Sequence, residues 1–69
     1  MTVKKDLEKA IAAAESAKGS YASFATATDD KTAQEMFKQM SQDMDRHIAQ
    51  INSRLSQNAE NQLQNLQNQ

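Results

Sequence analysis

Two apolar stripes with helical spacing mirror each other about Asp29, and this symmetry constrains the fold more than any other feature of the chain. When residues on the two sides of Asp29 are paired so that their numbers sum to 58, an apolar residue nearly always meets another apolar residue. An antiparallel helical hairpin requires this matching, because each helix must bury its stripe against the other. The pairs that obey the rule are Tyr21 and Phe37, Ala14 and Met44, Ala10 and Ile48, Leu7 and Ile51, and Val3 and Leu55, while Ala17 with Met40 and Phe24 with Ala33 miss it by one residue.

The first stripe predicts a helix over residues 3–27. Its apolar residues recur at alternating spacings of four and three, as in a heptad seam, and the alanine-rich surroundings favour helix. Thr2 is the expected N-cap, because its hydroxyl can accept a hydrogen bond from an early helical N–H. Gly19 leaves two interpretations open: the helix breaks there, or it continues with a bend. The stripe passes Gly19 without losing phase, so we favour continuation.

The second stripe predicts a helix over residues 31–57, because its apolar positions recur close to the period of an α-helix. Residues 26–30 have short side chains that can bond to the nearby backbone, which predicts the turn. Asp29 or Asp30 is the expected cap of this second helix. The sequence therefore predicts an all-α chain that folds as an antiparallel two-helix hairpin.

Residues 58–69 differ in character, since nearly all of them are Gln or Asn. The mirror rule pairs Met1 with Gln57, so nothing in the first helix can cover residues 58–69. Such a polar, low-complexity segment predicts a frayed or disordered tail. In the alternative interpretation, Leu63 and Leu66 extend the apolar stripe and contact a second chain, which makes them candidate interface residues.

The length of 69 residues allows one small domain, in which a single seam offsets the conformational entropy of folding only narrowly. Domains of this size are usually stabilised by disulfides, metals or association. The chain has no cysteine, which excludes disulfides and thiolate metal sites. A lone hairpin also leaves one side of each helix uncovered, so we expect a homodimer that forms a four-helix bundle. Ile11 and Met36, on the flanks of the stripes, are the candidate interface residues.

The charge pattern argues against nucleic acid and membranes as partners. The net charge is −1, and acidic and basic residues are interspersed, as on a solvated helical surface. The N-terminus lacks the apolar region of a secretory signal, and no apolar run approaches membrane-spanning length, so the expected location is the cytoplasm. Peripheral membrane association through an exposed Met and Ile face is a third hypothesis, against which the balanced charge argues.

Asp43 and His47 are the candidate metal ligands, because they lie one turn apart and His47 is the single histidine. Helical di-iron bundles combine a Glu and a His three residues apart with further carboxylates on facing helices. Here the spacing is four, and the facing helix offers Ile11 instead of an acid. We therefore expect a half-exposed histidine paired with Asp43 and no cofactor. The alternative is a metal-binding bundle that uses both residues across a symmetric interface.

No grouping of residues indicates an enzyme. Tyr21 lies among serines and threonines, but no set of nucleophile, base and orienting group is present. We expect the Tyr21 ring to pack against Phe37 and its hydroxyl to stay in water. Glycine-rich phosphate loops and metalloprotease motifs are also absent from the sequence. The favoured function is a noncatalytic structural or adaptor protein that acts through self-association and through helix-face contacts with a protein partner of unknown identity.

Three segments of the chain resemble a known family. They are MTV at the N-terminus, KGSYASFA over residues 18–25, and QDMDRHIAQINSRL over residues 42–55. Together they are similar to the family catalogued as domain of unknown function 1657, which consists of short helical proteins of endospore-forming bacteria. The resemblance covers residues 1 to about 55 and carries no catalytic or binding residues with it. Some members resemble companions of spore-membrane and germination-channel proteins, so the resemblance implies a connection with the spore or forespore.

Overall fold

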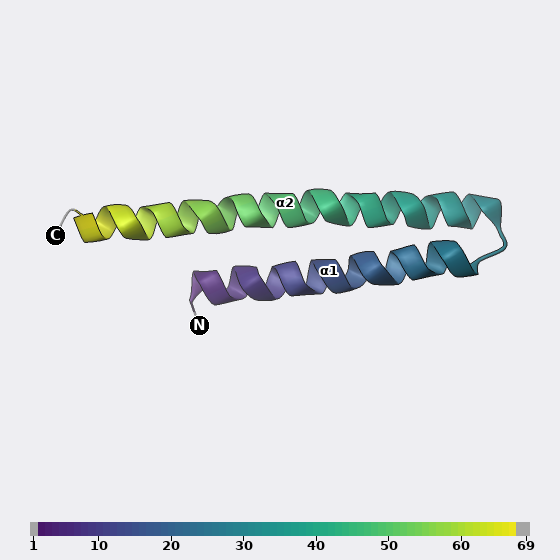
Figure 1. Cartoon of the computed structure of the whole chain (residues 1–69), viewed down its shortest axis with the longest axis horizontal. Helices are drawn as coiled ribbons and strands as arrows, with labels where there is room; N and C mark the ends of the chain where they lie inside the picture. The colour runs from purple at the N-terminus through teal and green to yellow at the C-terminus, as the bar shows by residue number, and fades with distance from the viewer. Residues whose placement is uncertain (1, 68–69) are drawn as a thin grey trace.

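Two helices, α1 (Val3–Ala27) and α2 (Lys31–Gln67), lie side by side and antiparallel in the computed structural model (Figure 1). The structure describes the backbone of residues 2–67 and the side chains of residues 2–60. The helices pack against each other along α1. The predicted all-α fold of two packed helices is therefore confirmed.

Short side chains at the helix ends define the boundaries and the turn. Thr2 accepts a hydrogen bond at its Oγ1 from the Lys5 N–H, at 3.1 Å, and so caps α1 as predicted. α1 ends at Ala27 because Thr28 has an extended backbone. Asp30, rather than Asp29, caps α2, since its Oδ2 accepts a hydrogen bond from the Ala33 N–H at 3.3 Å.

α1 continues through Gly19 without a break, which is the interpretation that the sequence favoured. A Cβ placed on Gly19 would meet no atom within 4 Å. Gly19 therefore lies at an open position on the helix, where neither a close approach nor an unusual backbone angle requires glycine.

α2 ends at Gln67, ten residues later than the predicted boundary at 57. Neither glycine nor proline follows Gly19 in the chain, and Gln, Ala and Leu favour helix, so nothing ends the helix within residues 58–67. The backbone is helical here, where the sequence predicts a frayed or disordered tail. Figure 1 shows this part of α2 projecting past the N-terminal end of α1. The side chains of Leu63 and Leu66 lie outside the described residues, so their interface role stays a prediction.

The seam between the helices follows the predicted stripe on α2, and on α1 it departs from the stripe at the two ends of the helix. All seven apolar residues of the α2 stripe are half-buried. On α1, Ala25 is only 5% exposed, whereas Phe24 and Val3, both predicted in the seam, are 50% and 51% exposed. The small Ala25 lets the two backbones approach closely beside the turn, which a phenylalanine at the same place would prevent.

The predicted ring partner of Phe37 is wrong, since Phe37 packs against Phe24 and not against Tyr21. The Phe24 and Phe37 ring centroids are 5.4 Å apart and the ring planes are tilted by 53°. Helical side chains lean toward the N-terminus of their own helix. In this hairpin they lean away from the turn on α1 and toward it on α2. A ring on α1 therefore meets a ring that starts farther from the turn than the mirror rule predicts.

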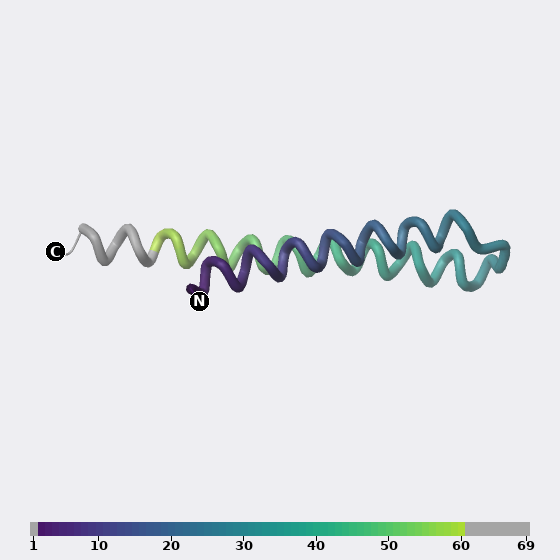
Figure 2. The backbone as a smooth tube through the Cα atoms, turned by 90° about the horizontal axis from the view of Figure 1, so that it is seen from below, coloured from purple at the N-terminus to yellow at the C-terminus, as the bar shows by residue number. Residues whose placement is uncertain are grey.

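The hairpin forms one layer with almost no interior. Among the side chains of residues 2–60, Ala25 is the only one that is buried, and it is still 5% exposed. The Cα trace measures 60 × 18 × 11 Å, and the view along the layer shows the two helices crossing at a shallow angle (Figure 2). Protein domains usually place two such layers around a core.

Gly19→Ala is expected to raise the free energy of unfolding by roughly 0.5–1 kcal/mol, because alanine favours helix and the added Cβ meets open space. Urea unfolding followed by circular dichroism at one fixed protein concentration measures the change. The matched control Ser20→Gly, at the next exposed helical position, should lower the same free energy by a similar amount. A loss of stability in Gly19→Ala would contradict an open helical position.

Deletion of residues 58–69 is expected to change the free energy of unfolding by less than about 0.5 kcal/mol, because this part of α2 projects past α1. Thermal unfolding of the truncated and full chains provides the comparison. A control truncation that also removes the half-buried Leu55 should be clearly less stable. A large loss from the shorter deletion would instead indicate that the projecting part contacts a second chain.

Candidate functional site

One side of the hairpin is closed by polar bonds between the helices. Gln34 Nε2 donates a hydrogen bond to the Ala25 carbonyl at 3.1 Å, and Ser41 Oγ donates one to the Lys18 carbonyl at 3.4 Å. Lys18 Nζ also lies 2.6 Å from Asp45 Oδ1. We call this surface the Lys18 side, and it comprises Lys18, Ala22 and Ala25 of α1 and Gln34, Lys38, Ser41 and Asp45 of α2.

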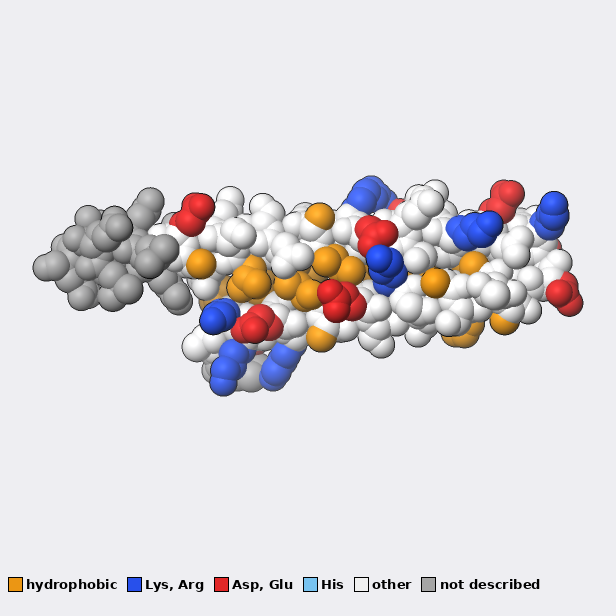
Figure 3. Space-filling model, in the orientation of Figure 1, with side chains coloured by type: hydrophobic (Ala, Val, Ile, Leu, Met, Phe, Trp, Pro, Cys, Tyr) orange, Lys and Arg blue, Asp and Glu red, His pale blue; other side chains and the backbone are white. Residues whose placement is uncertain are grey.

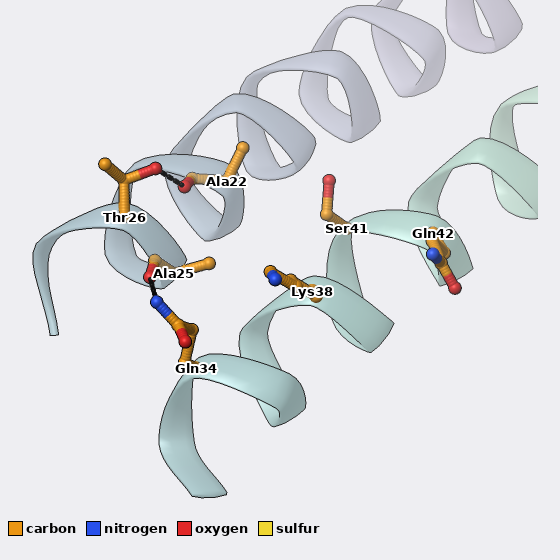
Figure 4. A pocket seen from close by; sticks show the side chains of 7 residues that line it. All are labelled: Ala22, Ala25, Thr26, Gln34, Lys38, Ser41 and Gln42. Atoms are coloured by element: carbon orange, nitrogen blue, oxygen red, sulfur yellow. Dashed lines mark hydrogen bonds between the residues drawn. The ribbon is translucent and has the colours of Figure 1, made fainter. Parts of the chain in front are cut away.

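An open groove of about 510 Å³ lies on the Lys18 side near the turn (Figure 4). Lys38 is the one charged residue among those that line it, and Thr26 Oγ1 is already bonded to the Ala22 carbonyl at 3.2 Å. A cofactor site needs several polar groups that converge on the ligand. Three of its polar side chains, those of Thr26, Gln34 and Ser41, already donate to backbone carbonyls. The lining residues are Ala22, Ala25, Thr26, Gln34, Lys38, Ser41 and Gln42.

The other side of the hairpin carries large apolar side chains in contact with solvent. Val3, Phe24 and Met36 are 51%, 50% and 51% exposed, and they are the exposed large hydrophobic residues of the described chain. We call this surface the Phe24 side. Its exposed residues are Val3 and Phe24 of α1 and Met36 and His47 of α2, and it borders the half-buried seam residues Ala10, Ala17, Ala33 and Met40.

Helix periodicity places these two sides on opposite flanks of the seam. Residues seven apart lie on nearly the same side of a helix, with a drift of roughly 20°. Val3, Ala10, Ala17 and Phe24 form one series with this spacing, and Lys18 and Ala25 belong to the other. The half-buried Tyr21 lies between the two series, because Phe24 follows it by three residues and Ala25 by four. Phe24 and Ala25 therefore project on opposite flanks of Tyr21.

Figure 3 shows the Lys18 side, because the exposed His47 belongs to the Phe24 side and no histidine is visible in this view. Hydrophobic side chains on this face gather between the two helices, away from the turn, and charged side chains flank them. The apolar residues of the seam are half-buried. Apolar surface on the Lys18 side is thus concentrated in the seam, in contrast to the half-exposed Val3, Phe24 and Met36 of the Phe24 side.

The two candidate interface residues with described side chains lie on different sides. Met36 is 51% exposed on the Phe24 side. Ile11 is half-buried and lies seven residues before Lys18, which places it on the Lys18 side. Ile11 and Met36 therefore do not belong to one continuous surface of a single hairpin.

Asp43 has its hydrogen-bond partners on its own helix. Gln39 Nε2 donates to Asp43 Oδ1 at 3.0 Å, and the Arg46 guanidinium donates to the same oxygen. The hydrogen bond from Gln39, that from Arg46, and the positive charges of Arg46 and His47 together lower the pKa of Asp43 below its usual value of 3.8. His47 thus acts on Asp43 through its charge, while Gln39 and Arg46 both donate to Asp43 Oδ1.

Asp43 and His47 do not form part of a larger cluster of ligands. Among the residues with described side chains, no group of three or more His, Cys, Asp or Glu is arranged to hold a metal ion. A metal ion bound by protein alone usually requires at least three such ligands. The metal-binding alternative therefore depends on a second chain.

In the part of the chain that the structure describes, neither helix has a stretch long and apolar enough to cross a membrane.

The cross-helix bonds of the Lys18 side were missed by the sequence reasoning, which followed apolar residues alone. A signal was present, because Gln34, Lys38, Ser41 and Asp45 recur at spacings of four, three and four. This polar series runs directly beside the apolar stripe of α2. It could have indicated which flank of the seam is closed by polar contacts.

A family model matches residues 7–55, and the family is described as protein of unknown function (DUF1657). The matched segment includes the turn and most of the seam, and it confirms the resemblance inferred from the sequence. Comparisons with curated proteins and with solved structures give no match.

Gln39→Ala is expected to raise the pKa of Asp43 toward 3.8, because the hydrogen bond from Gln39 is the largest cause of its lowering. A titration of the side-chain carboxyl carbons by NMR measures this pKa. The control Gln42→Ala, at another glutamine of α2, should leave it unchanged.

The lowered pKa of Asp43 also determines how the stability of the fold changes with pH. The Asp43 carboxylate stabilises the fold above the pKa that it has in the unfolded chain, and this contribution is lost as the pH falls through its lower folded-state pKa. Asp43→Asn should therefore weaken the acid dependence of the thermal midpoint. An unchanged acid dependence would contradict the assignment.

Proposed function

We propose, for a chain that belongs to the family described as protein of unknown function (DUF1657), a noncatalytic structural or adaptor role that depends on self-association through a helix face. The simplest assembly is a dimer of two hairpins that forms a four-helix bundle. The hairpin supplies two of the four helices.

The observation that carries this proposal is the exposed area of the hairpin. The chain exposes 5337 Å². A compact monomer of 7.7 kDa is expected to expose about 4,300 Å², so this hairpin exposes roughly 1,000 Å² more. The uncovered sides of the single layer contribute to this excess.

The uncovered sides of the layer are available for a contact between two chains. A specific interface buries about 800 Å² on each partner. A second hairpin would add the missing layer, and the seam residues that are now half-buried would become the interior of a bundle. Self-association would therefore stabilise the fold and also form the assembly on which the proposed structural role depends.

The family resemblance also leads to a proposal for where in the cell the protein acts. Because it implies a connection with the spore, we propose that the protein acts in the cytoplasm of the cell or forespore. Fractionation of sporulating cells, with immunodetection of the chain in the forespore and in the mother cell, would test this location.

Self-association predicts a sedimenting mass of twice the 7.7 kDa chain mass, with a monomer appearing only on dilution. Sedimentation equilibrium over about a hundredfold range of concentration measures the dissociation constant, and the thermal midpoint should rise over the same range. A well-folded monomer at every concentration, with a constant thermal midpoint, would contradict the proposal.

A further inference from the structure

We infer that a second copy of this chain packs on the Phe24 side, while the Lys18 side faces solvent. The inference rests on the self-association proposed above and adds to it the surface and the partner. It follows from three differences between the two sides: exposed apolar area, polar bonding and charge.

The Phe24 side has the exposed apolar area that association would remove from water. Val3, Phe24 and Met36 are each about half exposed, and all three belong to this side. Phe24 and Met36 lie near the turn and Val3 lies at the start of α1, so exposed apolar side chains are present at both ends of α1. Burial of such a surface is the main favourable contribution to association.

The Lys18 side has less to gain from a partner. Its polar side chains already bond across the seam, through Gln34 to Ala25 and Ser41 to Lys18. The ion pair between Lys18 and Asp45 is also half exposed, with side-chain exposures of 45% and 55%. A partner on this side would remove these charges from water, which costs free energy that the existing pair does not recover.

A second copy fits the Phe24 side because a two-fold interface uses the same surface on both chains. The charge at its edge is already compensated, since Asp43, seven residues after Met36, is paired with Arg46. The carboxylate of Asp43 therefore brings a partner from its own chain to the contact.

Single cysteines test the inference directly, because the chain has none of its own. Met36→Cys places a thiol on the Phe24 side, and the matched variant Gln42→Cys places one on the same helix at the groove of the Lys18 side. Labelling by a maleimide is measured below and above the dissociation constant of the wild-type chain. If only monomer reacts at Met36→Cys, labelling slows about tenfold when nine-tenths of the chain is dimeric. Gln42→Cys should react at the same rate at both concentrations.

A second pair of variants measures affinity without relying on labelling. Met36→Lys should weaken the dimer at least about tenfold, because it brings a charge into the buried contact. Gln42→Lys should leave the dissociation constant unchanged. Circular dichroism shows whether each variant is folded, and the two cysteine variants, which add no charge, keep the test valid if Met36→Lys does not fold.

The outcomes separate the inference from the proposed function. A dimer in which Met36→Cys stays fully reactive, or in which Gln42→Cys is the protected position, overturns the inference and leaves self-association intact. A monomer at every concentration overturns both. Protection of Met36→Cys that appears only with anionic phospholipid vesicles assigns the Phe24 side to a membrane surface and overturns the inference.

Discussion

The packing of α1 against α2 along one seam is the interaction on which the rest of this structure depends. A helix in a two-helix layer can cover only one side of its neighbour, so the seam residues stay half-buried and Ala25 is the only buried residue among the described side chains. This limit explains why a well-matched hairpin still exposes an area larger than its mass predicts. Association is the physical remedy that a chain without cysteine retains.

The seam is covered differently on the two sides of the layer. On the Lys18 side, side chains of α2 reach carbonyl groups of α1, so polar contacts close the seam from outside. On the Phe24 side, a ring contact between Phe24 and Phe37 leaves half of Phe24 uncovered. A single layer with one polar and one apolar side has the asymmetry of an amphipathic helix on a larger scale. This asymmetry determines which side of the hairpin faces the second chain in the proposed dimer.

Much of the fold could be predicted because the signals are local or periodic. Thr2 caps α1 through its own hydroxyl, and Asp30 caps α2 through its own carboxylate, so a few neighbouring residues decide each boundary. The candidate site was harder to predict. Positions Leu7, Ala14 and Tyr21 are compatible with a seam that continues through Phe24 or through Ala25, since a heptad pattern alone does not choose between the two flanks. Asp43 was likewise assigned to His47, although Gln39 and Arg46 are equally close along the helix.

The sequence by itself determined that two helices meet about Asp29, because the spacing and mirror order of apolar residues allow little else. Only the tertiary structure decided which flank is polar and which side chains meet. The mirror rule describes backbone positions, whereas side chains lean along their helices in opposite directions relative to the turn. The pairs Phe24 with Phe37 and Lys18 with Asp45 therefore join residues that no backbone register would pair. At the turn end of α1, Ala25 is buried and Phe24 is half exposed, so the flank that is buried there leaves a large apolar side chain in water.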